Sequence, residues 1–204
     1  MRQTEVSRAT MGRIPVYLEY LKKEKHLGDN ISATALAKQL GLGEVQVRKD
    51  LSAVSGAGRP KTGYNVSELI AALEEFLGVG IKNKVILAGA GKLGRALLDY
   101  NGFGDYGLEI TAAFDKAVTG KENSSFGKPI YPMEELPDYC SKNKVRIGII
   151  TVPASAAQEV ADELVKAGIE AIWSFAPCTL SVPDNIVVQY ENMALSLAFL
   201  NKKI

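Results

Sequence analysis

The chain has 204 residues, of which 47% are hydrophobic and 23% are charged. This composition excludes a disordered or collagen-like chain and is sufficient for one or two buried cores. No stretch reaches the roughly 18 uninterrupted apolar residues of a membrane span, and the N-terminus lacks a secretory signal pattern, so we expect a cytoplasmic protein. Cys140 and Cys178 lack CxxC spacing and the single histidine, His26, has no ligand-like neighbour, so we expect neither a metal site nor a disulfide.

The net charge of +1 hides an asymmetry along the chain. Residues 1–64 hold 11 Lys and Arg against 6 Asp and Glu, whereas residues 65–204 hold 13 against 17, so the two segments carry +5 and −4. A basic segment joined to a mildly acidic one favours contact between the first part and a polyanion, although a solvated surface is compatible with the same charge.

The first two predicted helices lie within residues 14–40. The apolar residues of 14–21 have helical spacing, and the helix ends before the turn residues 28–30. A short second helix begins after Ser32, a suitable N-cap residue, and ends at Gly41.

Residues 44–54 predict a third helix, with Val45, Leu51 and Val54 on its apolar side. A short helix, a glycine-bearing turn and a second helix with amide and basic side chains form the helix-turn-helix pattern, whose second helix fits the major groove. Arg48 is suited to guanine and Gln46 to adenine, whereas Lys49 and Ser52 are suited to phosphates. A three-helix packing module with a solvated polar face is the alternative.

The loop over 55–64 is rich in glycine and basic, which favours a two-stranded wing over the DNA backbone. Its candidate DNA-binding residues are Arg59, Lys61, Gly63 and Tyr64. Apolar residues at helical spacing within 67–80 then predict a linking helix. We therefore expect a winged helix-turn-helix domain over residues 1–80.

A nucleotide-binding pattern opens the second half. The apolar run 84–88 predicts a strand, which leads directly into a GxGxxG motif and a helix. The first glycine permits the tight turn, the second lets the backbone approach a pyrophosphate, and the third lets helix and sheet pack closely. The residues of this fingerprint are Gly89, Ala90, Gly91, Lys92, Leu93 and Gly94.

An acidic residue follows the fingerprint where an adenosine ribose would bind. The predicted strand 109–114 ends in Asp115, which lies 21 residues beyond Gly94. A carboxylate there favours NAD over NADP, although the neighbouring Lys116 is able to accept a 2′-phosphate. The ligand is therefore predicted to be NAD(H), with coenzyme A or another nucleotide as the competitor.

The remaining elements complete an alternation of strands and helices. Residues 151–153 end the third strand, at the sheet edge where ligands bind in open α/β sheets, so Thr151, Val152 and Pro153 are further candidate cofactor residues. The predicted strands 145–152, 169–175 and 186–190, and the helices 156–168 and 192–201, complete an α/β protein. We expect a Rossmann-type doubly wound parallel sheet over residues 81–190.

Several features argue against an enzyme. The Rossmann segment has no histidine and leaves no second domain to hold a substrate. A small NAD-dependent dehydrogenase would need Lys, Tyr or Asp as its acid and base, and Tyr100 has no lysine four residues on. We therefore expect a ligand sensor without a catalytic residue, with the dehydrogenase as the alternative.

The order of motifs resembles the Rex family of repressors over essentially the whole chain. The stretches that carry the resemblance are Gln-Val-Arg-Lys-Asp-Leu-Ser at 46–52, Gly-Tyr-Asn-Val at 63–66, Asp-Tyr-Asn-Gly-Phe at 99–103 and Phe-Ala-Pro at 175–177. The resemblance implies a transcriptional repressor that senses the NADH/NAD⁺ ratio. It implies that the protein binds an AT-rich inverted repeat of double-stranded DNA as a homodimer and is released by NADH.

The same resemblance implies roles for individual segments. Tyr100 would lie near the nicotinamide, Asp115 at the adenosine ribose and residues 151–153 beside the cofactor. The C-terminal segment 191–204 would be a helix exchanged between subunits, whereas a helix that covers its own sheet is the alternative. Glu19, Asn192 and Met193 stand where some members carry Arg, Asp and a bulky apolar residue, so an Arg–Asp ion pair across the dimer is not available to this chain.

Overall fold

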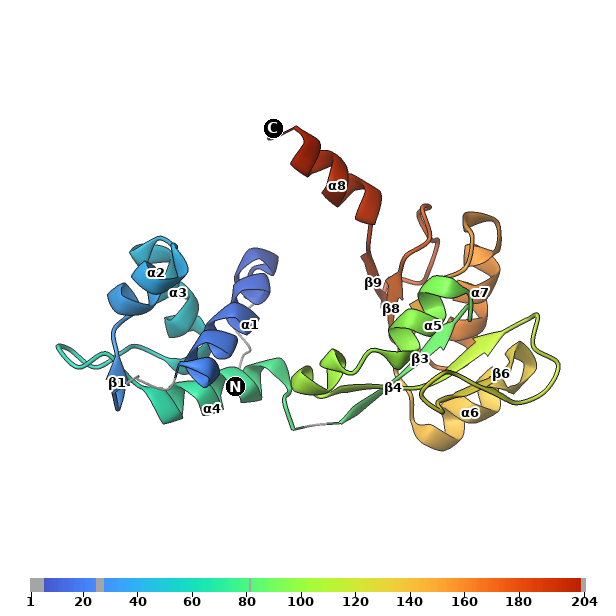
Figure 1. The fold of residues 1–204 in the computed structure, drawn as a ribbon, viewed down its shortest axis with the longest axis horizontal. Helices are drawn as coiled ribbons and strands as arrows, with labels where there is room; N and C mark the ends of the chain where they lie inside the picture. Colours follow the sequence, from blue (N-terminus) through green and yellow to red (C-terminus); the bar gives the residue numbers. More distant parts are fainter. Residues whose placement is uncertain (1–5, 25–27, 81, 203–204) are drawn as a thin grey trace. The chain divides into compact units, whose positions relative to one another are not determined.

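The computed structural model describes residues 6–24, 28–80 and 82–202, so His26 lies outside the described residues. The chain divides into two compact units, residues 1–81 and 82–204 (Figure 1). Each unit has its own buried core.

The first unit is mainly helical. Ser7 and Ser32 cap two of its helices by accepting hydrogen bonds from the backbone three residues on, and Gly41, at a φ of 64°, ends the helix that Ser32 begins. Its elements are α1 (Arg8–Lys23), β1 (Asn30–Ile31), α2 (Ala33–Leu40), α3 (Glu44–Ser55), β2 (Tyr64–Asn65) and α4 (Val66–Leu77). The two short strands pair antiparallel. The predicted order of helices is confirmed, and α1 begins earlier than the apolar pattern indicated.

The inward face of α3 differs from the predicted one. Val45 is 66% exposed, whereas Val47, Asp50 and Leu51 are buried. Positions 47, 50, 51 and 54 follow the i, i+3, i+4, i+7 spacing of one helix face, and Val45 lies outside it. This spacing therefore places the carboxylate of Asp50 on the buried face of the helix.

The linking helix α4 packs in the first unit. Its Leu69 and Leu73 are buried in one cluster with Tyr17 of α1 and Leu51 of α3. Gly78 ends the helix in the left-handed conformation at a φ of 71°. The helix therefore belongs to the core of the first unit.

The second unit is built on a seven-stranded sheet with the order β5-β6-β4-β3-β7-β8-β9. All neighbouring strands pair in parallel except β5, which is antiparallel to β6. The strands are β3 (Asn83–Ala88), β4 (Leu108–Asp115), β5 (Glu122–Asn123), β6 (Pro129–Pro132), β7 (Ile147–Ile150), β8 (Ala171–Ser174) and β9 (Val187–Tyr190). The chain moves outward from β3 in one direction and then returns to β7 on its other side, so the order reverses between β3 and β7.

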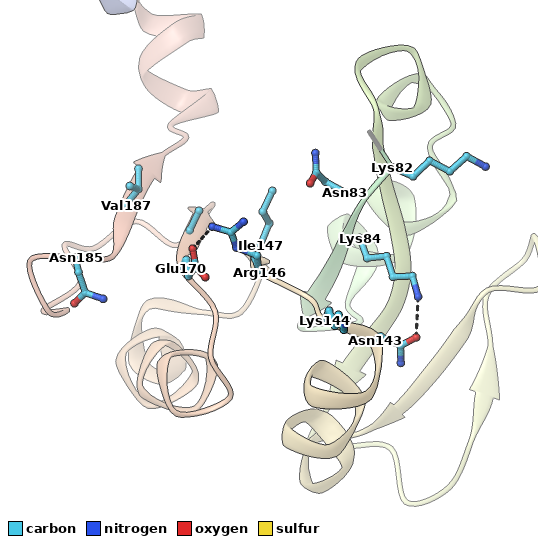
Figure 2. Close-up of a pocket in the computed structure, with 11 residues that line it drawn as sticks. Lys82, Asn83, Lys84, Asn143, Lys144, Arg146, Ile147, Glu170, Asn185 and Val187 are labelled. Carbon is cyan, nitrogen blue, oxygen red and sulfur yellow. Dashed lines mark hydrogen bonds and ion pairs between the residues drawn. The ribbon is translucent and has the colours of Figure 1, made fainter. Parts of the chain in front are cut away.

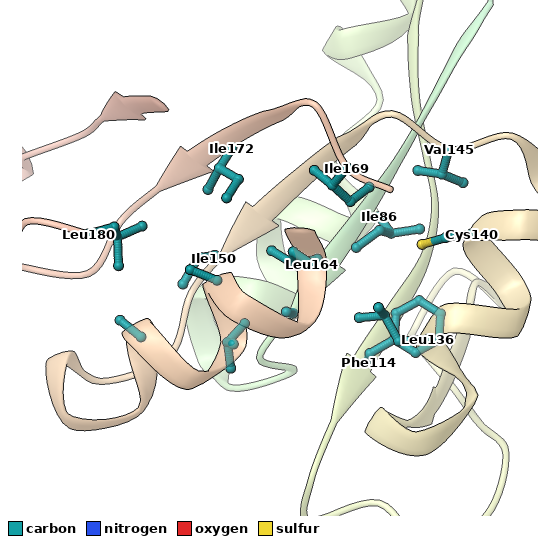
Figure 3. Packing of buried hydrophobic residues seen from close by; sticks show 14 of the residues in the cluster. Ile86, Phe114, Leu136, Cys140, Val145, Ile150, Leu164, Ile169, Ile172 and Leu180 are labelled. Atoms are coloured by element: carbon teal, nitrogen blue, oxygen red, sulfur yellow. The ribbon is translucent and has the colours of Figure 1, made fainter. Parts of the chain in front are cut away.

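Helices cover both faces of this sheet. The described helical elements are α5 (Lys92–Asp99), the 3₁₀ turns η1 (Gly102–Tyr106) and η2 (Met133–Glu135), α6 (Leu136–Asn143), α7 (Ala154–Lys166) and α8 (Met193–Asn201). Figure 3 shows Leu136 and Cys140 of α6 and Leu164 of α7 gathered against Ile86 and Phe114 on one face. On the other face, Leu98 of α5 packs with strand residues that alternate with these. The Rossmann-type doubly wound parallel sheet and the winged helix-turn-helix unit are both confirmed.

The interval 116–143 holds elements that the sequence pattern did not predict. Strand β6 is Pro-Ile-Tyr-Pro, whose prolines interrupt a strand pattern, and β5 has only two residues. The helix α6 covers one face of the sheet through Leu136 and Cys140. Burial raises the pKa of the Cys140 thiol to about 11, and both cysteines are free.

Candidate functional site

The outward side of α3 carries the predicted DNA-reading residues. Its side chains at Gln46, Arg48, Lys49 and Ser52 are all exposed, because the buried face of the helix is formed by Val47, Asp50 and Leu51. Arg48 forms an ion pair with Glu44 one turn earlier on the same helix. The basic side chain is thus already held along the helix surface before any ligand is bound.

The wing is a small hairpin closed by two hydrogen bonds. The Arg59 N–H donates to the Gly63 carbonyl at 2.7 Å, and the Gly63 N–H donates to the Arg59 carbonyl at 2.9 Å. Gly63 has a φ of +81°, and a Cβ there would lie 2.4 Å from the Ile31 carbonyl oxygen. The position therefore requires glycine, because the hairpin crosses close to β1.

A groove of about 300 Å³ lies between the wing and α3, the second or recognition helix of the helix-turn-helix. Arg48 of α3 and the exposed Arg59 and Lys61 of the wing line it, together with the first residues of α2. Three cationic side chains from two separate elements, α3 and the wing, thus line one groove. This arrangement is suited to the phosphates of a polyanion.

Tyr64 was predicted as a DNA-binding residue, but the structure places its side chain in the core. It is only 9% exposed, and a Cβ on Gly58 would lie 2.8 Å from its ring. The ring therefore packs beneath the wing, where it fixes the hairpin against the helices.

A buried carboxylate ties α1 to the recognition helix. Asp50 of α3 accepts hydrogen bonds from Thr10 Oγ1 at 2.9 Å and from the Tyr17 hydroxyl at 2.7 Å. Arg13 donates from Nε to Asp50 Oδ2 at 2.7 Å and from Nη2 to Asp50 Oδ1 at 2.9 Å. Four donors thus surround one carboxylate, and three side chains of α1 converge on a single residue of α3.

The protonation states of this network follow from its contacts. Burial raises the pKa of Asp50, but hydrogen bonds from Arg13, Tyr17 and Thr10 outweigh it, so the pKa lies below its usual value. The hydrogen bond to Asp50 raises the pKa of Arg13. Burial and the contact with Asp50 raise the pKa of Tyr17 to about 12. The network is therefore a carboxylate, a guanidinium and a neutral phenol at neutral pH.

The fingerprint 89–94 forms the turn after β3 and the first residues of α5, at the point where the strand order reverses. Gly89 has a φ of +105°, and a Cβ there would lie 2.7 Å from Val152 Cγ1. A Cβ on Gly94 would lie 1.9 Å from the Gly89 carbonyl oxygen. A Cβ on Gly91, in contrast, meets nothing within 4 Å. Gly89 and Gly94 are therefore required for packing, whereas Gly91 leaves open space in front of α5.

The helix α5 begins directly at this open space. Its N-cap, Gly91, has no side chain to accept from the first turn, so backbone N–H groups of that turn remain for an anion. Thr151 Oγ1 donates to the Gly89 carbonyl at 2.7 Å, which fixes the loop to the end of β7. The predicted residues Gly89–Gly94 and Thr151–Val152 thus lie together at the carboxyl ends of the central strands β3 and β7.

Asp115 lies at the same edge, at the end of β4. The Ala90 N–H donates to Asp115 Oδ2 at 2.7 Å, and the Ala117 N–H donates to Asp115 Oδ1 at 2.8 Å. Each carboxylate oxygen keeps a lone pair for a further donor such as a ribose hydroxyl. The adjacent Lys116 is exposed.

Sequence reasoning missed Arg95, which supports the loop from α5. Its Nε donates to the Ala90 carbonyl at 2.9 Å, and its Nη2 forms an ion pair with Glu122 of β5 at 3.1 Å. The arginine directly after the last glycine was a visible signal, but its partner lies on a strand that the pattern did not predict.

Tyr100 is not brought together with the other predicted cofactor residues. It follows the last residue of α5, so at 1.5 Å per residue it lies roughly 12 Å along the helix from Lys92, where the helix begins. It is 57% exposed, and together with Lys82, the first residue of the unit, it lines a small cavity. Among the described residues of the single chain, the side chain of Tyr100 is thus open to solvent.

A row of aromatic rings nevertheless connects Tyr100 with the cofactor edge. The ring centroids of Tyr100 and Phe103 are 5.1 Å apart, those of Phe103 and Trp173 are 6.1 Å apart, and those of Trp173 and Phe175 are 4.5 Å apart. The Phe175 N–H donates to the carbonyl of Ile150, the residue before Thr151. The row therefore runs across one sheet face toward the end of β7.

The opposite end of the sheet carries a larger cavity of about 530 Å³. Figure 2 shows Arg146 paired with Glu170 and Lys84 bonded to Asn143, with Lys82 and Lys84 extending away from Arg146. These residues lie where the strands begin, whereas the fingerprint lies where they end. The cavity is therefore separate from the predicted cofactor site.

Glu19, Asn192 and Met193 depart from the pattern of some Rex proteins, and the first two have partners within their own helices. Glu19 forms an ion pair with Lys23 at 2.6 Å. The side chain of Asn192 accepts from the Leu195 N–H at 2.9 Å and so caps α8. Met193 begins the helix and is 57% exposed.

Within residues 6–24, 28–80 and 82–202, the side chains of His, Cys, Asp and Glu form no group of three that could hold a metal. None of the described helices is long and apolar enough to span a bilayer.

Two family models match separate parts of the chain. One, described as "CoA binding domain", matches residues 81–178. The other, described as "Putative DNA-binding protein N-terminus", matches residues 5–52. Their boundary agrees with the division into two units.

Known relatives match nearly the whole chain. A protein of Porphyromonas gingivalis named redox-sensing transcriptional repressor Rex is 41% identical over 196 residues, which cover 96% of this chain and 90% of the relative. A protein of the same name from Treponema denticola is 44% identical over 191 residues, which cover 92% of this chain and 90% of the relative.

Solved structures also match nearly the whole chain. The crystal structure of RSP in complex with beta-NAD⁺ and operator DNA has a TM-score of 0.90 and 34% identity, and the match covers 98% of this chain and 93% of that chain. RSP in complex with beta-NADH has a TM-score of 0.82 and 33% identity, with 98% and 94% coverage. RSP is described as a Rex-family repressor.

Proposed function

The chain belongs to the Rex family of redox-sensing transcriptional repressors, and we propose that it binds operator DNA through its first unit and is released when its second unit binds NADH. The observation that carries this function is the similarity over 98% of the chain to a structure with both NAD⁺ and operator DNA bound. A dehydrogenase is not favoured, because the relatives are repressors. We propose that the protein catalyses no reaction and acts in the cytoplasm.

DNA binding is assigned to the exposed side of α3 and to the wing. We propose that the exposed Gln46 and Arg48 meet base edges and that the exposed Lys49 and Ser52 meet phosphates. Arg59 and Lys61 border the groove of about 300 Å³, and we propose that they meet the DNA backbone beside the wing. An inverted repeat is the operator that a two-fold homodimer would recognise.

NAD(H) is assigned to the edge between β3 and β7. The open space at Gly91 and the uncapped start of α5 fit a pyrophosphate, which the backbone N–H groups of Lys92 and Leu93 would meet. Asp115 would bind the adenosine ribose, and the half-buried Thr151 and Val152 with the exposed Pro153 would border the remainder of the cofactor. When bound, the nicotinamide supplies a group whose charge differs between the two redox forms.

The repressor requires a coupling between the two units. A ligand shifts a two-state equilibrium only through its different affinity for the two states. A change of about tenfold in operator affinity requires roughly 1.4 kcal/mol of coupling. We propose that NADH and NAD⁺ favour different arrangements of the two subunits and so of their recognition helices.

A homodimer is proposed with α8 exchanged between subunits. Leu195, Leu197 and Leu200 of this helix are 65%, 69% and 59% exposed, which leaves much apolar surface for a second copy to cover. The double substitution Leu197→Glu and Leu200→Glu is expected to convert the dimer to a monomer and to weaken operator binding at least tenfold, as measured by light scattering and anisotropy. The conservative substitution Glu191→Gln, at a half-buried position just before the helix, is the control. A dimer that survives the double substitution would contradict the exchange.

The decisive experiment is fluorescence anisotropy with a labelled AT-rich inverted repeat, in which NAD⁺ and NADH are titrated separately at fixed salt. We expect NADH to release the protein and NAD⁺ to oppose that release. Operator binding that is indifferent to both cofactors would contradict the sensor. Thermal shifts with NADH, NADPH and coenzyme A at matched concentrations then identify the ligand, because a ligand that binds the native state raises the unfolding midpoint.

Tyr100→Ala is expected to raise the NADH concentration for half-release of the operator about fivefold, because it removes one end of the aromatic row. NADH binding, followed by thermal shift, should change little, since Tyr100 lies far along α5 from the fingerprint. Tyr100→Phe keeps the ring contact with Phe103 and should respond like the natural protein. An unchanged NADH response in the alanine variant would exclude this role.

A further inference from the structure

The guanidinium of Arg13 contacts Gln46, the glutamine at the start of the recognition helix, as well as Asp50. Arg13 Nη1 lies 2.9 Å and Nη2 lies 3.1 Å from the amide oxygen of Gln46 when that oxygen faces the guanidinium. The amide must take this orientation, because a guanidinium carries only donors and an amide nitrogen accepts nothing. Both lone pairs of the Gln46 oxygen are therefore engaged inside the protein.

The position of Arg13 is itself fixed. Its Nε and Nη2 are bonded to the two oxygens of Asp50, which is buried in α3, and Nη2 also lies 3.3 Å from Thr10 Oγ1. A bidentate contact holds the plane of a guanidinium as well as its place. Arg13 thus presents its remaining N–H groups to Gln46 in one orientation.

The outward end of Gln46 consequently carries hydrogen-bond donors alone. A free glutamine reads adenine with two contacts, donating to N7 and accepting from the N6 amino group. Here the accepting atom already receives two charge-assisted hydrogen bonds, which are roughly twice as strong as neutral ones. Turning the amide to meet an adenine amino group would exchange these bonds for a single weaker one.

We propose that Arg13 is a positioning residue that makes Gln46 a donor-only reader of the operator. Gln46 then recognises acceptors on base edges in the major groove, such as purine N7, guanine O6 or thymine O4, and is indifferent to the adenine amino group. This inference rests on the proposed repressor function. It replaces the sequence-based expectation of a bidentate contact between Gln46 and adenine.

The test uses the full-length protein and operators in which one purine at a time is altered. A 7-deaza purine lacks the N7 acceptor, whereas purine in place of adenine lacks the amino donor. Comparison of the natural protein with Gln46→Ala first identifies the base pair at which Gln46 acts. There we expect removal of the acceptor to weaken binding about fivefold in the natural protein and not in Gln46→Ala, and removal of the amino group to have no effect.

Two further variants separate positioning from folding. Arg13→Lys keeps a cation beside Asp50, but an ammonium cannot serve both oxygens of Asp50 and Gln46, so sensitivity to the adenine amino group should appear. Gln46→Glu lies on the exposed side of the helix and keeps an acceptor for Arg13 but has no N–H, so it should lose sensitivity to N7. Lys49→Ala is the matched control and should weaken all operators alike.

The results that would contradict the donor-only assignment differ from those that would contradict the repressor function. If loss of the amino group weakens the natural protein but not Gln46→Ala, or if Gln46→Ala leaves every base preference unchanged, the donor-only assignment is wrong. If the natural protein binds no inverted repeat at all, the proposed function fails instead.

Discussion

Gly94→Ala is expected to abolish NADH binding and with it the NADH-dependent release of the operator. Its Cβ would lie 1.9 Å from the Gly89 carbonyl oxygen and 2.9 Å from Thr151 Oγ1. Both atoms belong to the junction between the fingerprint and β7, so α5 would have to move away from the sheet. Overpacking of this kind costs typically about 1–3 kcal/mol and occasionally more, and we expect a loss near 3 kcal/mol for the second unit.

A matched pair of glycines separates packing from ligand contact. A Cβ on Gly91 meets no atom, so Gly91→Ala should fold normally and yet lose NADH affinity, because the added methyl group lies where a pyrophosphate would pass. Gly104→Ala, also in open space but on η1, should change neither property. Urea unfolding and NADH thermal shifts measure the two effects. A Gly91→Ala variant that binds NADH with unchanged affinity would place the pyrophosphate elsewhere.

The cofactor edge could be predicted from sequence because its determinants are contiguous. The strand, the turn and the start of the helix all lie within 83–99, and each glycine acts on its immediate neighbours or on the adjacent strand end. Asp115 was found by its spacing alone. The place of Tyr100 beside the nicotinamide stays a prediction, because this residue follows the end of α5 and lies away from the loop that begins the helix.

The polar network of the first unit could not be predicted in the same way. Asp50 lies in the motif that carries the family resemblance, but its partners Thr10, Arg13 and Tyr17 are 40, 37 and 33 residues away. The predicted apolar side of α3 included Val45. The side that is buried includes Asp50 together with the apolar residues Val47 and Leu51. A charged residue on a buried helix face requires a partner, and that requirement was the available signal.

The second large effect is expected for Asp50→Asn, which should destabilise the first unit by about 3 kcal/mol. The substitution leaves the Arg13 guanidinium, whose side chain is only 21% exposed, without its counter-charge. It also turns one carboxylate oxygen into an amide nitrogen, which cannot accept from Tyr17 or Arg13. Lys49→Ala, on the neighbouring exposed position, is the control and should lie within about 0.5 kcal/mol of the natural protein.

The pH dependence of this difference tests its cause. The pKa of Asp50 is lower in the folded than in the unfolded chain, so its contribution is complete above the unfolded value of about 3.9 and declines as the pH falls through the folded value. The difference in unfolding free energy between the natural protein and Asp50→Asn should therefore be constant between pH 5 and pH 8 and should shrink below about pH 4. Urea unfolding at several pH values measures it. A difference that persists undiminished into acid would mean that packing, and not the charge of Asp50, holds the recognition helix to α1.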